Sequence, residues 1–165
     1  MELNSDCYQY SYGFSNIVNM DGLFGENAVR HFQYLGCSGA KVPEIKDKHV
    51  PKMQKSQAVT LTAGGNDAHL ATLLNYCVYQ WATAWLWTCD GELDKAEKEV
   101  QGDAYLKDMK DLLIAIEGKL QDDNSRIYWA GYMRFFDTST KECDDVTWAF
   151  SRNYGFRQFL TQARR

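Results

Sequence analysis

Four consecutive residues, Gly64, Gly65, Asn66 and Asp67, combine a freely turning backbone with two polar side chains. Paired glycines allow a sharp turn where a side chain would clash. The side-chain amide of an asparagine in such a turn can donate a hydrogen bond to a developing oxyanion, as acyl transfer requires. An ordinary Gly-Asn turn, with Asp67 as the N-cap of a following helix, is a second interpretation. A phosphate-binding loop is a third, which the missing lysine and the negative Asp67 disfavour.

A second turn of small residues, Cys37-Ser38-Gly39-Ala40, offers a backbone donor. The N–H of Gly39 could face a ligand, because small residues let the backbone approach closely. The alternative is a tight turn held by a disulfide. Ser38 lacks the spacing of the G-x-S-x-G nucleophile motif, and a nucleophilic serine also needs a base and a residue that orients the base.

Both turns follow segments with the composition of β-strands. Residues 31–36 lead into the Cys37 turn, residues 58–63 lead into the glycine pair, and residues 126–131 form a third such segment. β-Branched and aromatic residues with glycine near each exit favour strands. The two turns therefore lie at the carboxyl ends of the first two expected strands.

Helical patterns fill the sequence between the second and third expected strands. One apolar face predicts a helix after Asp67, and residues 92–120 predict a longer helix that breaks near Gly102. Strands that alternate with helices predict an α/β fold with a mostly parallel sheet, in which chemistry lies at the carboxyl ends of the strands. The expected apolar faces are Leu70, Leu73, Leu74, Cys77 and Val78 on the first helix, and Leu106, Met109, Leu112, Leu113, Ile116 and Leu120 on the second.

Composition and charge exclude several classes of protein. A chain of 165 residues suits one domain, and we expect residues 1–165 to form a single one. With 18 basic and 22 acidic residues the net charge is −4, which gives no indication of nucleic-acid binding. Apolar runs are too short to cross a membrane. Residues 1–6 are polar and lack the basic and apolar regions of a signal peptide, so none is predicted within this chain.

The ordered set of blocks resembles the SGNH (GDSL-type) hydrolases, which are secreted esterases and lipases. The second and third conserved blocks of that family are similar to residues 32–40 and 59–67, which contain the two turns. The likeness is greatest to the disulfide-bonded, lipase-like branch of fungi and actinobacteria. It continues through residues 74–77, 89–90, 126–136 and 143–148, and so covers most of the chain.

This resemblance implies a three-layer α/β/α sandwich with a parallel sheet of flavodoxin-like topology. It implies hydrolysis of small-molecule or lipid esters through a serine nucleophile and an acyl-enzyme, with the full-length family form a monomer and no cofactor. It also implies two oxyanion donors, the backbone amide of Gly39 and the side-chain amide of Asn66. Loss of one such donor typically costs about 10²–10³ in rate.

Two catalytic blocks of the family are not found in these 165 residues. No Gly-Asp-Ser occurs, and His31, His49 and His69 do not lie in an Asp-x-x-His context. We therefore expect a domain truncated at both ends and inactive alone. A non-catalytic pseudoenzyme or binding-module remnant of the same fold is the first alternative. A cytosolic flavodoxin-like domain that binds a phosphorylated small molecule is the second.

The five cysteines separate these alternatives. None has metal-site spacing and the three histidines are scattered, so no metal site is expected. The resemblance implies the disulfides Cys7–Cys37 and Cys77–Cys89, and pairs Cys143 with a cysteine beyond residue 165. Disulfides indicate an extracellular protein, whereas a cytosolic domain would keep free thiols.

Overall fold

A computed structural model describes residues 7, 13–22, 30–79, 89–132 and 139 of the chain. The described residues divide into two compact units, one drawn from residues 1–63 and 107–130, and the other from residues 64–106 and 131–165. We describe each unit separately, and the single-domain organisation stays a prediction.

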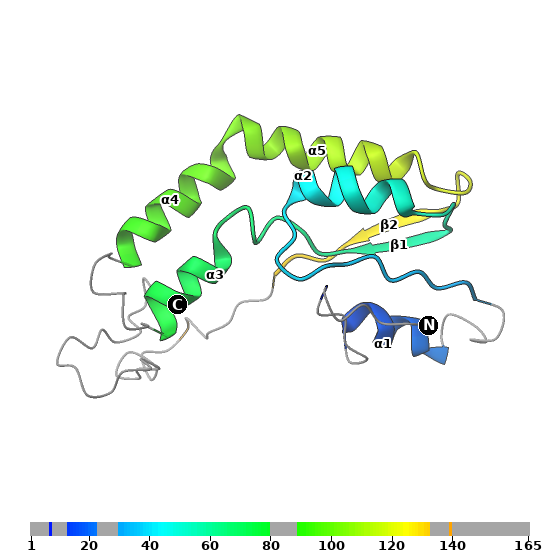
Figure 1. Cartoon of the computed structure of the whole chain (residues 1–165), viewed down its shortest axis with the longest axis horizontal. Helices are drawn as coiled ribbons and strands as arrows, with labels where there is room; N and C mark the ends of the chain where they lie inside the picture. The colour runs from blue at the N-terminus through cyan, green and yellow to red at the C-terminus, as the bar shows by residue number, and fades with distance from the viewer. Residues whose placement is uncertain (1–6, 8–12, 23–29, 80–88, 133–138, 140–165) are drawn as a thin grey trace. The chain divides into compact units, whose positions relative to one another are not determined.

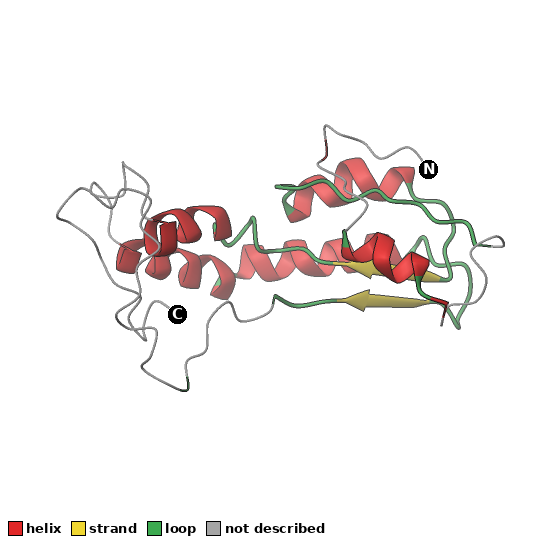
Figure 2. Cartoon of the chain, turned by 90° about the horizontal axis from the view of Figure 1, so that it is seen from below, coloured by secondary structure: helices red, strands yellow, loops and turns green. Residues whose placement is uncertain are grey.

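The first unit is built on two parallel strands, β1 (Ala58–Leu61) and β2 (Arg126–Trp129). Their register pairs Val59 with Ile127 and Leu61 with Trp129, and both arrows point the same way in Figure 2. The strand predictions for residues 58–63 and 126–131 are therefore confirmed, each with a shorter span. The helices between the two strands in sequence make the parallel crossover that the α/β prediction requires.

Three helical segments in succession cover one face of this sheet. They are α2 (Val42–Glu44), the π-helix η4 (Ile45–His49) and the 3₁₀-helix η5 (Val50–Lys52). Proline near the start of α2 and of η5 suits the first helical turn, where a missing N–H breaks no bond. Beside them runs α5 (Asp103–Glu117).

The core of the first unit lies between these helices and the sheet. Leu112 and Ile116 of α5 are fully buried, as is Val42 of α2. Val59 and Leu61 pack against them from β1, and Ile127 and Trp129 from β2. Alternate residues of a strand face opposite sides of a sheet, so these four share the core face.

The opposite face of the sheet carries α1 (Phe14–Met20), which Figure 1 shows across the strands from α2 and α5. Thr60 lies between two core-facing residues of β1, and its hydroxyl is 3.4 Å from the Ser15 hydroxyl of α1. The first unit therefore has three layers, helix, sheet and helix, as the predicted α/β/α class requires.

The second unit contains α3 (Leu70–Leu73), the π-helix η6 (Leu74–Tyr79) and α4 (Cys89–Gln101). Its buried cluster joins Cys77, Val78 and Cys89 to Leu73, Leu74 and Leu93, the last three partly buried. This arrangement confirms the predicted apolar face of the first helix.

The predicted helix over residues 92–120 is also confirmed as a pair of helices interrupted at Gly102, although α4 begins at Cys89 and α5 ends at Glu117. Its apolar face is narrower than expected. Leu106 is 57% exposed and Leu113 is 36% exposed, whereas Leu112 and Ile116 are buried in the core of the first unit.

The strand predicted over residues 31–36 is wrong, because these residues belong to neither β1 nor β2. A side chain ties the segment to its neighbour. The Gln33 amide nitrogen donates to the Lys52 carbonyl at 2.9 Å, and its amide oxygen accepts from the Gln54 N–H at 3.0 Å. Strand formation needs a backbone partner, which composition alone does not supply.

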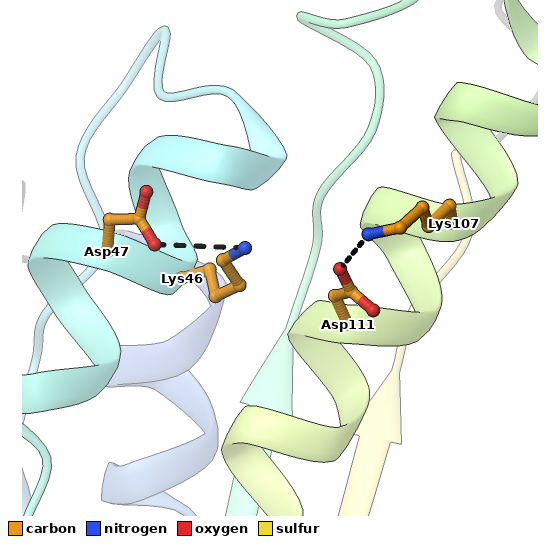
Figure 3. A network of polar contacts seen from close by, with 4 residues as sticks. All are labelled: Lys46, Asp47, Lys107 and Asp111. Atoms are coloured by element: carbon orange, nitrogen blue, oxygen red, sulfur yellow. Dashed lines mark hydrogen bonds and ion pairs between the residues drawn. The ribbon is translucent and has the colours of Figure 1, made fainter.

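Charged side chains of η4 and α5 form a polar group at the surface of the first unit (Figure 3). Lys107 and Asp111 are 2.7 Å apart, and Lys46 and Asp47 are 3.8 Å apart. The hydrogen bond from Lys107 is the main cause that lowers the pKa of the Asp111 carboxyl, and the charge of Lys46 acts in the same direction. Exposed pairs of this kind contribute little to stability.

Two lysines connect the end of α5 to the segment that follows η5. Lys55 donates to the carbonyls of Gly118 and Leu120 at 3.0 and 3.1 Å. Lys119 donates in return to the carbonyls of Pro51 and Met53 at 3.3 and 3.2 Å. An ammonium group at a helix C-terminus satisfies carbonyls without helical partners and complements the helix dipole.

We expect Lys55→Met to lower the free energy of unfolding by about 1 kcal/mol, because two carbonyls beside the end of α5 lose a charged donor. Urea unfolding of the full chain measures this difference. Lys110→Met is the matched control, since Lys110 is a lysine within α5 that makes no hydrogen bond or ion pair with a described residue. Equal losses in both variants would contradict the proposed role of Lys55.

Candidate active site

The predicted donor Gly39 lies in a tight turn of the first unit. The Ala40 N–H donates to the Cys37 carbonyl at 3.3 Å, which closes a four-residue turn. Gly39 is its third residue and has φ +80°, a left-handed conformation that favours glycine at this position of a turn. The local sequence therefore folds as it does because Gly39 tolerates this backbone.

A disulfide and a backbone hydrogen bond hold the same turn. Cys7 is bonded to Cys37, and the Ser38 N–H donates to the Cys7 carbonyl at 3.0 Å. Gly39 is exposed, and its N–H makes no hydrogen bond to a residue that the structure describes. The structure thus has the disulfide-held turn that the sequence indicated, and the role of Gly39 as a donor stays a prediction.

The loop that contains Asn66 lies in the second unit and folds back on itself. The N–H groups of Ala68 and Leu70 each donate at 2.9 Å, to the carbonyls of Gly64 and Gly65 respectively. Gly64 has φ +103°, so the first glycine is required by the backbone. Asn66 lies inside this closed loop, with its side chain partly buried.

The predicted role of Asp67 as a helix N-cap is wrong. The helix α3 begins at Leu70, and its N-cap is His69. The hydrogen bond from the Leu70 N–H to the Gly65 carbonyl closes a turn that includes Asp67. The N-cap therefore lies two residues after Asp67. A non-glycine residue in the left-handed region is uncommon, and His69 has φ 58°. Its side chain is exposed.

Tyr132 contacts this loop from a distant part of the sequence. The buried Gly65 N–H donates to the Tyr132 phenol oxygen at 3.1 Å. A Cβ on Gly65 would lie 2.6 Å from the end of the Tyr132 ring, closer than carbon atoms approach. The second glycine is therefore needed for close approach, whereas the first is needed for its backbone conformation.

The sequence analysis did not identify Tyr132 as a site residue. A signal was present, because Tyr132 comes three residues after the end of β2 and Gly65 comes four after the end of β1. The carboxyl ends of paired parallel strands lie at one edge of a sheet, so residues that follow them emerge close together.

Burial and the charge of the loop both affect the pKa of a second tyrosine, Tyr105. Burial raises the pKa of the Tyr105 phenol, and the negative charge of Asp67 and the neighbouring Tyr132 raise it further.

Within the second unit, a hydrogen bond connects the loop that contains Asn66 to Tyr132. Within the first unit, a disulfide connects the turn that contains Gly39 to Cys7. The meeting of Gly39 and Asn66 at one substrate oxygen stays a prediction. In the second unit Cys77 and Cys89 form the other disulfide that the resemblance implies, and both are buried. Cys143 lies outside the described residues.

Other features of the described residues do not add to this site. A hollow in the first unit is lined by Arg30, His31, Phe32, Gln33 and Gln54, none of them predicted to act. Among the described side chains no group of three or more His, Cys, Asp or Glu could hold a metal ion. No helix in the described part of the chain is both long enough and apolar enough to span a bilayer.

Comparison with known proteins gives one structural likeness. The chain is similar to the crystal structure of phospholipase A1 from Streptomyces albidoflavus NA297, with a TM-score of 0.64 and 21% sequence identity over 85% of this chain. The chain spans 56% of the length of that enzyme. No family model matches the sequence, and no curated protein matches it. The likeness shows that this chain shares the fold of that phospholipase A1 over the matched residues.

We expect Gly65→Ala to lower the free energy of unfolding by about 1–3 kcal/mol, because the added methyl group overlaps the Tyr132 ring. Thermal unfolding of the full chain measures the loss. Gly131→Ala is the control, since a Cβ at Gly131 meets no atom within 4 Å and Gly131 has no positive φ. A Gly65→Ala variant as stable as the Gly131→Ala variant would contradict the close contact.

Proposed function

We propose that this chain supplies the oxyanion donors of an SGNH-type ester hydrolase that acts on small-molecule or lipid esters. The observation that carries the proposal is the likeness to a phospholipase A1 fold. Residues 32–40 and 59–67 resemble the two donor blocks of the SGNH hydrolases and support it. The open N–H of Gly39 and the closed loop around Asn66 are consistent with it.

In this mechanism a serine hydroxyl attacks the carbonyl carbon of the ester, and a base takes the hydroxyl proton. The carbonyl oxygen becomes negative in the tetrahedral intermediate, where Gly39 and Asn66 each donate a hydrogen bond to it. Collapse releases the alcohol and leaves an acyl-enzyme, which water hydrolyses. We propose that the serine and the base come from sequence outside these 165 residues, so that the present chain binds but does not turn over.

A non-catalytic binding protein on the same fold is the second candidate. The observation that favours it is that neither Gly-Asp-Ser nor Asp-x-x-His occurs in the sequence. A binding protein of this kind recognises the neutral ester and has no need to favour a tetrahedral anion. The two candidates therefore differ in which ligand they bind more tightly.

We expect n-butylphosphonate, a tetrahedral anion with a short alkyl chain, to bind at least tenfold more tightly than methyl butyrate. Calorimetric titration of the full chain measures both affinities. Asn66→Ala should weaken phosphonate binding by about tenfold to a hundredfold, because a hydrogen bond to a charged oxygen is lost. Asn124→Ala, at an exposed turn of the first unit, is the control and should have no effect.

Equal affinity for the two ligands, or tighter binding of the ester, would favour the binding protein. Turnover of p-nitrophenyl butyrate by the full chain, lost in Asn66→Ala, would overturn the statement that the nucleophile lies outside these residues.

We also propose that the protein is extracellular, on the basis of the disulfides Cys7–Cys37 and Cys77–Cys89. We expect a thiol titration in denaturant to find one free thiol per chain, that of Cys143, and five after reduction. Five free thiols before reduction would instead support a cytosolic flavodoxin-like domain.

A further inference from the structure

The loop around Asn66 is fixed by two kinds of hydrogen bond. Bonds from Ala68, His69 and Leu70 return to carbonyls of residues 64–66 and fix the loop internally. The bond from the Gly65 N–H to Tyr132 connects the loop to a segment 67 residues away in sequence. Internal bonds set the shape of the loop, whereas the bond to Tyr132 sets its orientation.

The bond to Tyr132 acts on the residue directly before Asn66. Fixing the Gly65 N–H fixes the plane of the Gly64–Gly65 peptide group, which is rigid because of its partial double bond. Rotation of this group would swing the next residue, Asn66, through an arc. A donor displaced by about 1 Å from a developing charge costs about 10²-fold in rate.

Shape complementarity supports the same role. The end of the Tyr132 ring occupies the space beside Gly65 that a Cβ would fill, so the present position of the ring requires glycine there. Tyr132 is itself half exposed, with 50% of its surface open, so packing of the core does not explain its position. The phenol oxygen is the part of the residue that meets the loop.

We propose that Tyr132 is the positioning residue of the Asn66 donor: by accepting the Gly65 N–H it holds the loop in the orientation that the oxyanion requires. This inference rests on the proposed function. Tyr132 acts through Gly65 and does not itself touch the substrate.

The test uses Tyr132→Phe in the full chain, which keeps the ring and removes the acceptor. We expect hydrogen exchange of the Gly65 amide to become about tenfold faster, and the affinity for n-butylphosphonate to fall about tenfold. Exchange at Cys77 and Val78, in the core of the second unit, should not change. Tyr128→Phe is the control, because Tyr128 is 56% exposed and its hydroxyl makes no hydrogen bond to a described residue.

Three results would overturn the inference. The first is an unchanged Gly65 exchange rate in Tyr132→Phe. The second is faster exchange at Gly65 with unchanged phosphonate affinity, which would make the contact structural only. The third applies if Tyr132→Phe does not fold: wild-type Gly65 must then exchange more slowly than Gly131, and equal rates would contradict the bond.

The proposed function fails separately, in the wild-type chain. If n-butylphosphonate does not bind there, the oxyanion site is absent and Tyr132 positions no donor. If it binds and loses affinity in Asn66→Ala but not in Tyr132→Phe, the proposed function stands and only the role of Tyr132 is wrong.

Discussion

The parallel pairing of β1 with β2 is the constraint on which the other features depend. The two strands are joined only after more than sixty residues of intervening chain, yet their register brings Leu61 opposite Trp129. A parallel pair directs both carboxyl ends to one edge of the sheet. Gly65 and Tyr132 follow these two strands in sequence by four and three residues, and a hydrogen bond joins them.

The two proposed donors are held by different devices, each suited to its type. Gly39 donates from the backbone, so a turn of fixed φ held by the Cys7–Cys37 disulfide is enough to fix it. Asn66 donates from a side chain, which has rotatable bonds of its own, and its loop carries more constraints: the left-handed Gly64, the left-handed His69 and the contact with Tyr132. Backbone conformations of this kind concentrate at functional sites.

The sequence predicts the parts of the fold that depend on local pattern. Strand composition located β1 and β2, and helical spacing located the buried face of α3 and η6 and the interruption at Gly102. It fails where the outcome depends on a distant partner. Residues 31–36 have strand composition but join no ladder. Tyr132 was missed for the same reason, since its partner is 67 residues away.

Gly64 and Gly65 are each needed for a different physical reason. Gly64 is required by its own φ, which any side chain would strain, and this demand can be read from a turn-like sequence. Gly65 is required by the ring of Tyr132, a demand that exists only once the chain has folded. In the proposed function, the contact of Gly65 with Tyr132 orients the next side chain, Asn66, as an oxyanion donor requires.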